Sequence, residues 1–425
     1  MAKRPRPPRT QSSAETPAPS TGAAVRIRMY DVGFGDCFLM FLPAPDGRER
    51  KVLIDCGSFK AGRNALADVV GQVISDVTSD GVARIDLLVV THRHKDHISG
   101  FADPRWDAVE IGEVWMPWTE SDEPEAREIA RAQSALALAL QSYGQTVGAA
   151  ALDASPVLDL NAGVNQVAME RIRHGFPSQP KRRYLPEKDA ATRRIDCSFL
   201  PGVSIQVLGP SRDRETIFDM NPPSGEGYLT LLGMNAAGLS HSGRSTAPEP
   251  FGSQWIDDNP ERPLDETARG KLGELNRDLP LELATALDKA INNTSLMLLF
   301  TVGDAHLLFP GDAQWGTWRE VLKDADLCRQ LGECRFYKVG HHGSHNATPI
   351  SFVTKYLGTQ QQDVWAMVSV TNYSKWPDIP RQPLIDAIKN KAAHFVRSDS
   401  NRDDQGFRWE GNLYVEASIP MASSS

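Results

Sequence analysis

The sequence has no long apolar run, and none approaches the roughly 20 residues that an α-helix needs to cross a bilayer. Its five cysteines are odd in number and widely scattered, which excludes a disulfide framework. Residues 1–20 carry lysine and arginine but lack the apolar segment of a secretory signal. These absences predict a cytoplasmic protein with no membrane partner.

An excess of positive charge is also lacking. The formal net charge of −8 argues against a general nucleic-acid coat, although it leaves room for a local basic groove. Among 425 residues, 40% are hydrophobic and 24% charged, as is typical of a globular enzyme with a large core or two domains. Residues 1–24 are rich in Pro, Ser, Thr and basic residues and are expected to be a disordered tail.

The remaining chain carries strand and helix patterns in turn. Alternating or continuous apolar residues predict strands at 25–29, 38–42, 51–54, 86–90, 114–117, 203–210, 295–300, 306–309 and 364–370. Helical periodicity predicts helices at 64–77, 123–143 and 384–389. This order fits an α/β fold in which two sheets pack face to face with helices outside, an αββα sandwich.

The domain boundaries follow from the same patterns. One domain is expected from 25 to 415, and residues 416–425 are expected to be a flexible tail. Residues 211–285 hold Gly, Pro, Ser, Asn and charge without a steady period, which indicates an insertion. It would cap or flank an active site, or have no role.

One short segment carries the strongest chemical signal. His92, His94, Asp96 and His97 lie within six residues, directly after the apolar run at 86–90. Imidazole and carboxylate are common ligands of zinc and similar ions. In an extended segment, side chains two residues apart point the same way, so His92 and His94 can bind one ion together. A turn into a helix would direct Asp96 and His97 toward a second ion. The alternative is a histidine-rich surface loop.

This segment resembles the signature motif of the metallo-β-lactamase fold superfamily, and four other segments resemble that family in the right order. They are similar to the soluble hydrolase domain of the competence protein ComEC, without its membrane channel: Asp-Val-Gly-Phe-Gly-Asp at 31–36, Leu-Ile-Asp-Cys-Gly at 53–57, Leu-Phe-Pro-Gly-Asp at 308–312 and Lys-Val-Gly-His-His-Gly-Ser at 338–344. The resemblance implies a metallo-β-lactamase αββα sandwich.

The resemblance also implies roles for individual residues. Asp312 would bridge both ions, and His342 would complete the second site, with His341 beside it as a protonating group; which of the two histidines binds metal stays open. Asp96, His341 and Asp312 would be the catalytic residues. Asp55 would orient a ligand, because a metal-bound histidine needs an acceptor for its other nitrogen. Asp36 would either support a ligand or be a turn residue.

The sequence departs from the family at one ligand of the first ion. Many members have a further histidine where this chain reads Ile-Asn-Asn-Thr-Ser-Leu at 291–296. Asn293 could approach the ion or the substrate, but an amide oxygen suits harder ions than zinc. Two divalent ions are therefore expected, zinc first, with manganese or magnesium as alternatives. His345 and the stretch at 373–376 could contact a substrate phosphate and stack on a base, or be ordinary loop residues.

The leading functional hypothesis is a hydrolase that uses a water activated by two metal ions, acting as a phosphodiesterase or nuclease. The expected partner is an anionic substrate, nucleic acid included, and the basic segment 181–183 mildly favours an anionic polymer. A hydrolase of a small ester, lactone or phosphorylcholine-like group is the alternative. A regulatory or binding module with weakened catalysis is a third, which the intact motif disfavours. The sequence leaves the oligomeric state open.

Overall fold

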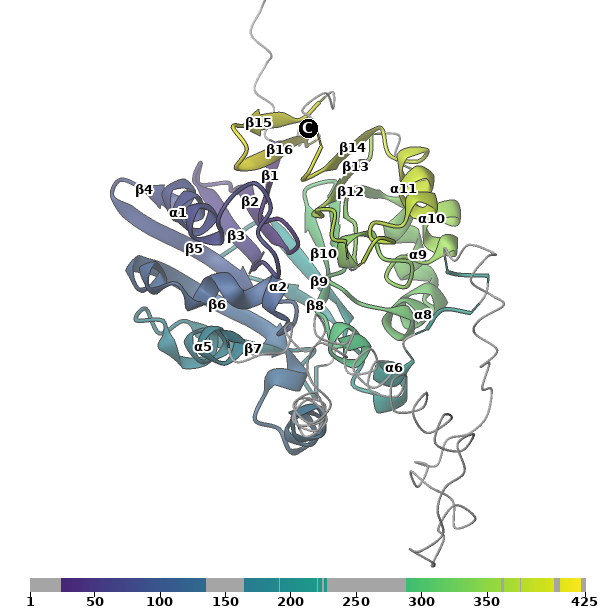
Figure 1. Ribbon diagram of the computed structural model, residues 1–425, viewed down its shortest axis with the longest axis horizontal. Coiled ribbons are helices and arrows are strands. Elements are labelled where there is room, and N and C mark those ends of the chain that lie inside the picture. Colours follow the sequence, from purple (N-terminus) through teal and green to yellow (C-terminus); the bar gives the residue numbers. More distant parts are fainter. Residues whose placement is uncertain are drawn as a thin grey trace, which may run out of the picture.

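A computed structural model describes residues 24–134, 164–190, 192–219, 221–223, 225–227, 288–360, 363–374, 376–400 and 406–421. These residues form a mixed α/β fold with two mixed sheets, which confirms the expected α/β class (Figure 1). Residues 1–23 of the tail expected at 1–24, residues 135–143 of the expected helix and most of the expected insertion lie outside the described residues, while Ala24 begins β1.

The first sheet has the strand order β15-β16-β1-β2-β3-β5-β6-β7, with β4 paired to β5. Its N-terminal strands are antiparallel, whereas β3, β5, β6 and β7 run parallel. The strands are β1 (Ala24–Tyr30), β2 (Cys37–Pro43), β3 (Glu49–Cys56), β4 (Thr78–Ser79), β5 (Val82–Val89), β6 (Val109–Pro117), β7 (Lys181–Leu185), β15 (Arg408–Glu410) and β16 (Tyr414–Pro420).

The second sheet has the order β14-β13-β12-β11-β10-β9-β8. Here β8 to β11 are antiparallel neighbours, and β11 to β14 run parallel. The strands are β8 (Arg194–Asp196), β9 (Val203–Gly209), β10 (Met297–Val302), β11 (Ala305–Phe309), β12 (Cys334–Lys338), β13 (Trp365–Val368) and β14 (His394–Arg397). The hairpin expected from 295–300 and 306–309 is confirmed as β10–β11.

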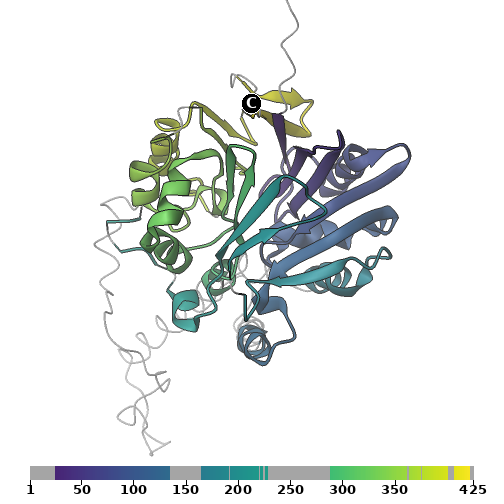
Figure 2. The same ribbon diagram turned by 180° about the vertical axis from the view of Figure 1, so that it is seen from behind.

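Helices cover the outer faces of the two sheets (Figures 1 and 2). They are α1 (Leu66–Val77), α2 (Lys95–Ile98), α5 (Val164–Glu170), α6 (Arg214–Phe218), α8 (Trp315–Lys323), α9 (Ala325–Gly332), α10 (Ile350–Lys355) and α11 (Gln382–Lys389). The helices expected at 64–77 and 384–389 are thereby confirmed, and residues 124–134 of the one expected at 123–143 are helical.

Three hydrophobic clusters hold these layers together. One lies between the sheets and joins residues of both, such as Phe38 of β2 and Phe309 of β11, whose ring centroids are 6.0 Å apart. A second packs α1 against the first sheet, and a third packs α8 to α11 against the second. The chain is thus layered helix, sheet, sheet, helix, because each sheet buries one face on its partner and the other under helices.

The C-terminal segment differs from the expectation of a flexible tail at 416–425. Strand β16 runs to Pro420 and pairs antiparallel with the whole of β1. Val415, Ala417 and Ile419 point into the core between the sheets. Glu416, on the opposite face, is buried and accepts a hydrogen bond from Arg28 Nε at 2.6 Å. For residues 416–420 the expectation was wrong, because the strand's pairing partner is almost 400 residues away in the sequence.

The topology places the polar motifs at one edge of the structure. The parallel strands β3 and β5 end side by side, as do β11 and β12. Asp55 lies at the end of β3, His92 follows β5, Asp312 follows β11 and His341 follows β12. The carboxyl ends of parallel strands are a common place for ligand sites in α/β proteins. Within the described residues, no helix has the length and apolar character that crossing a membrane requires.

We predict that Glu416→Ala lowers the free energy of unfolding by about 1.5–3 kcal/mol, because the largely buried Arg28 then keeps, among the described residues, only Asp76, at 2.7 Å, as a charged partner. Urea denaturation measures the change. Glu110→Ala is the control: its 3.5 Å pair with Arg84 is exposed, and its removal should change stability by less than about 0.5 kcal/mol. Equal effects of the two substitutions would contradict the structural role of β16.

Candidate metal centre

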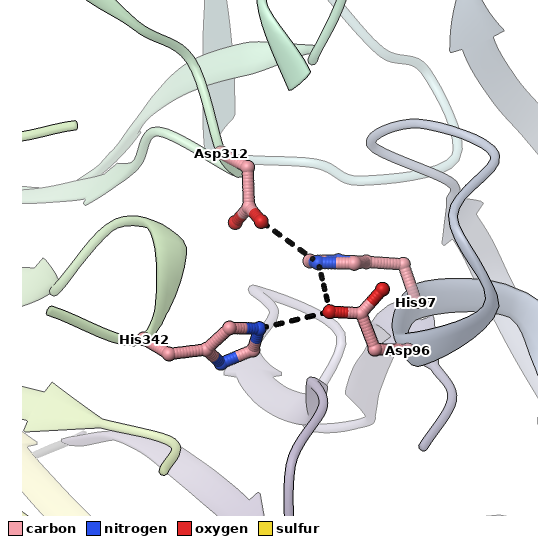
Figure 3. A group of neighbouring side chains, drawn as sticks. All are labelled: Asp96, His97, Asp312 and His342. Atoms are coloured by element: carbon pink, nitrogen blue, oxygen red, sulfur yellow. Dashed lines mark hydrogen bonds and ion pairs between the residues drawn. The ribbon is translucent and has the colours of Figure 1, made fainter. Parts of the chain in front are cut away.

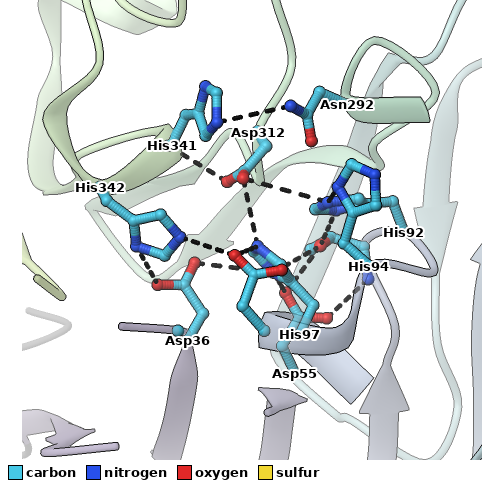
Figure 4. A network of polar contacts seen from close by, with 12 residues as sticks. Asp36, Asp55, His92, His94, His97, Asn292, Asp312, His341 and His342 are labelled. Atoms are coloured by element: carbon cyan, nitrogen blue, oxygen red, sulfur yellow. Dashed lines mark hydrogen bonds and ion pairs between the residues drawn. The ribbon is translucent and has the colours of Figure 1, made fainter. Parts of the chain in front are cut away.

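Five chain segments bring histidine and aspartate side chains to one point between the two sheets (Figure 4). After β5, residues 90–94 belong to no strand or helix, the backbone of His94 is extended, and α2 begins at Lys95, so the motif passes into a helix as expected. His92 and His94 lie before the helix, and Asp96 and His97 in the helix. All four side chains are buried.

Asp96, His97, Asp312 and His342 form a compact set of donor atoms (Figure 3). One ligand atom from each lies within 4.8 Å of all the others. Asp96 Oδ2 is 3.0 Å from His342 Nε2, and His97 Nε2 is 3.1 Å from Asp312 Oδ2. This set can hold a divalent ion, since it offers two imidazoles and two carboxylates.

A second set of donors adjoins the first. His92 Nε2 lies 3.1 Å from His94 Nδ1, a separation suited to two ligands of one ion. His92 Nε2 is also 4.0 Å from Asp312 Oδ2. Asp312 Oδ2 therefore lies near donor atoms of both sets.

Hydrogen bonds fix three of the imidazole rings from behind. His97 Nδ1 is 2.8 Å from Asp55 Oδ2, His342 Nδ1 is 2.9 Å from the carbonyl oxygen of Ser369, and His92 Nδ1 is 3.1 Å from Ser295 Oγ. Such bonds occupy the second ring nitrogen and leave Nε2 for an ion. The expectation that Asp55 orients a ligand agrees with this geometry. Asp55 is itself held by Thr91, whose backbone N–H and Oγ1–H both donate to its carboxylate.

Negative charge dominates the centre. Asp36, Asp55, Asp96 and Asp312 are almost fully buried, and Asp288 is largely buried beside them. Among the described residues, one basic side chain forms ion pairs with these carboxylates: Lys338 pairs with Asp36 and with Asp312. Five carboxylates against one ammonium leave a strong negative excess, which a buried site can hold only if protons or bound cations compensate it.

The pKa values reflect this excess. Burial alone would lower the pKa of His97, but Asp312, Asp96 and Asp55 raise it well above its usual value. Burial, together with the charges of Asp96 and Asp312, raises the pKa of Asp288 to about 7. A proton on His97 thus supplies positive charge at the place where a cation would otherwise supply it.

Several buried atoms that could bind metal have no hydrogen-bond partner among the described residues: His94 Nε2, Asp96 Oδ1, Asp36 Oδ1 and Asp288 Oδ1. Unpaired buried polar atoms are costly and rare in folded proteins. Other unpaired buried atoms occur elsewhere among the described residues, but the histidine and carboxylate atoms among them all lie at this centre, which fits a site for metal ions.

The backbone at the centre is held in an uncommon conformation. Asp55, His341 and His342 have φ values of 56°, 46° and 52°, in the left-handed region that favours glycine. Each such residue costs on the order of 1–3 kcal/mol, and strain of this kind concentrates at functional sites. Here it turns the two adjacent histidines of the 338–344 motif in different directions.

The two histidines consequently differ in role. His342 Nε2 belongs to the compact donor set, whereas His341 Nε2 is 3.4 Å from Asn292 Nδ2 and its Nδ1 is 3.4 Å from Asn346 Oδ1. The backbone N–H of His341 donates to Asp312 Oδ1 at 3.1 Å. The geometry favours His342 as the ligand and places His341 beside the bridging carboxylate.

The structure also places the remaining expected residues. Asp36 ion-pairs with Lys338, and its carboxylate is within 3.8 Å of His97 Nδ1, so it supports the centre. Asn293 is not brought to the cluster: its amide donates to the carbonyls of Thr216 and Ile217, and its oxygen accepts from the Gln314 N–H. His345 is half-buried, and burial with the nearby charge of Lys289 lowers its pKa to about 4.

Sequence reasoning missed Asp288, Lys338 and Ser369. Lys338 lay within the motif at 338–344 without an assigned role, and its placement after an apolar strand was the available signal. No pattern marked Asp288 or the carbonyl of Ser369. The basic segment 181–183 forms β7, where Lys181 pairs with Glu113 and Arg183 with Glu187, so this geometry does not favour a nucleic-acid contact there.

Comparison of the sequence with protein-family models and with curated proteins finds no match.

We predict that adding Zn²⁺ or Mn²⁺ raises the melting temperature, because ligands that bind only the folded state stabilise it, by about 2.7 kcal/mol at one hundred times Kd. His92→Ala with Asp312→Asn should abolish this rise. His306→Ala is the control, since His306 hydrogen-bonds Thr301 and lies outside both donor sets. The metal-site hypothesis fails if calorimetry shows no rise in the melting temperature of the wild type, or if the double variant keeps that rise.

Proposed function

We propose that this protein is a hydrolase of the metallo-β-lactamase fold that uses two divalent ions to cleave phosphodiester bonds, as a phosphodiesterase or nuclease. The observation that carries the proposal is the pair of donor sets joined by Asp312, at the shared edge of two face-to-face sheets. The layering of the sheets supports the assignment of fold, and the order of the motifs supports resemblance to ComEC-like domains.

The ligands divide between two ions. His92 and His94 would hold the first, Asp96, His97 and His342 the second, and Asp312 both. Zinc suits the imidazoles, while the many carboxylates also suit manganese or magnesium. When bound, such ions activate water and neutralise charge on a phosphoryl group.

His341 is the residue best placed to move a proton. Burial lowers its pKa, so the imidazole is neutral at pH 7. Asn292 Nδ2 faces its Nε2 and Asn346 Oδ1 faces its Nδ1, which fits a tautomer with the proton on Nδ1 and a lone pair on Nε2. His341 can accept a proton at Nε2 and return it to a leaving oxygen.

Aromatic rings and lysines beside the centre favour an anionic substrate that carries bases. The Phe34 ring lies 4.4 Å from the His342 ring and packs against Trp376, and Phe59 also packs against Trp376. Lys60 Nζ lies over Tyr373 and Lys95 Nζ over Phe59. Phe34 is buried, whereas Trp376 is partly exposed and can stack a base while the ammonium groups of Lys60 and Lys95 contact phosphates.

The other hypotheses find less support. A phosphorylcholine-like substrate would place a quaternary ammonium against aromatic rings, but lysines already occupy cation positions over Tyr373 and Phe59. A small ester or lactone would make no use of these lysines. A purely regulatory module has no need for the complete donor set, with its buried unpaired atoms.

Cleavage assays test the proposed activity. We expect the metal-loaded protein to cleave bis-p-nitrophenyl phosphate and at least one of single-stranded DNA, duplex DNA and RNA, and to leave p-nitrophenyl acetate and lactones largely intact. Asp312→Asn should lower turnover by at least 10–100-fold, since it removes the charge of a shared ligand. Ester or lactone cleavage without phosphodiester cleavage would reverse the order of the two hypotheses.

We predict that Lys60→Ala weakens binding of single-stranded DNA and makes it less dependent on salt, because fewer counterions are released from the phosphates. Lys389→Ala is a matched control: Lys389 is likewise exposed and lies over an aromatic ring, that of Phe395, but belongs to α11. Fluorescence anisotropy across a salt series measures both. Identical salt slopes for the two variants would contradict the role of Lys60.

A further inference from the structure

Three of the four histidines expected to bind metal have an oxygen close to the second ring nitrogen, and one does not. His92, His97 and His342 each have the second ring nitrogen within 3.1 Å of an oxygen, from Ser295, Asp55 and Ser369 respectively. An imidazole with one nitrogen held in this way has a defined tautomer and presents the other nitrogen to an ion.

His94 is the exception. Its Nδ1 faces His92 Nε2 at 3.1 Å, so Nδ1 is the atom directed at the first ion's position. Its Nε2 is buried and has no hydrogen-bond partner among the described residues, on a side chain only 2% exposed. The carboxylate oxygen that approaches it is Asp288 Oδ1, at 3.7 Å, which is also buried and also lacks a hydrogen-bond partner in the part of the chain that the structure describes.

The other oxygen of Asp288 is already fixed. Asn292 Nδ2 donates to Asp288 Oδ2 at 3.1 Å, across one turn of the helical residues 288–292. The same Nδ2 lies 3.4 Å from His341 Nε2. Asp288 is thus held through Oδ2, and its free oxygen Oδ1 points at His94.

We propose that Asp288 is the positioning residue of His94: its Oδ1 accepts a hydrogen bond from His94 Nε2–H and keeps the Nδ1 lone pair for the first ion. The inference rests on the proposed two-ion function and names a residue that the motifs do not contain. A shortening of 0.5–1 Å would turn the present approach into a hydrogen bond. The carboxylate also supplies negative charge near an ion that lacks the further histidine of many family members.

Metal affinity tests the inference without relying on activity. Wild type, Asp288→Ala and Asp288→Asn are equilibrated with a series of buffered free Zn²⁺ concentrations, and bound metal is counted by mass spectrometry. Asp288→Ala should lower the affinity for one of the two ions by about 10–100-fold. Asp288→Asn should lower this affinity less, because the amide oxygen can still accept a hydrogen bond from His94 Nε2–H. Asp326→Ala, an 88% exposed aspartate on α9, should leave both ions unchanged.

The outcomes separate the inference from the function on which it rests. A wild type that binds no ion overturns the proposed function, whatever the variants do. Two ions in the wild type with unchanged affinity in Asp288→Ala overturn the inference alone. A loss in Asp288→Asn as large as in Asp288→Ala also overturns it, since the carboxylate would then bind the ion directly. His342→Ala removes a ligand of the second ion. In a protein that carries this substitution, Asp288→Ala should cause the same loss of affinity for the ion that remains.

Discussion

The concentration of carboxylates between the two sheets is the constraint on which the rest of the centre depends. Asp36, Asp55, Asp96 and Asp312 are buried where water cannot screen them, and Lys338 offsets one charge. Removing a lone carboxylate from water costs several kcal/mol. Without cations the charge is met by protons, as the raised pKa values of His97 and Asp288 show. Divalent ions would replace those protons and release the imidazoles as ligands.

The fold serves this centre by bringing distant segments to one edge. Asp312 approaches His97 across 215 residues of sequence, and His342 approaches Asp96 across 246. Each reaches the centre because its parallel strand ends there, and the core between the sheets fixes where those ends lie. Left-handed backbone at Asp55, His341 and His342 then aims the side chains. The stability of the packed layers offsets the strain and charge that the centre carries.

Much of this could be predicted from local pattern. Alternation marked β1 and β9, a continuous apolar run marked β10, and the spacing of histidines after β5 marked the side chains that gather at the centre. What depends on long-range contact could not be predicted. Pairing of β16 with β1 turned an expected tail into a strand, and the amide of Asn293 proved to hold α6 rather than approach the cluster. Asp288 carries no local signal, because its significance comes only from its approach to His94.

The most direct test of the account is a crystal structure of the metal-loaded protein with anomalous scattering measured at the absorption edge of the bound metal. The account predicts two peaks, one beside His92 and His94 and the other beside Asp96, His97 and His342, with the Asp312 carboxylate touching both. A single peak, no peak, or ions that leave Asp312 without contact would contradict it.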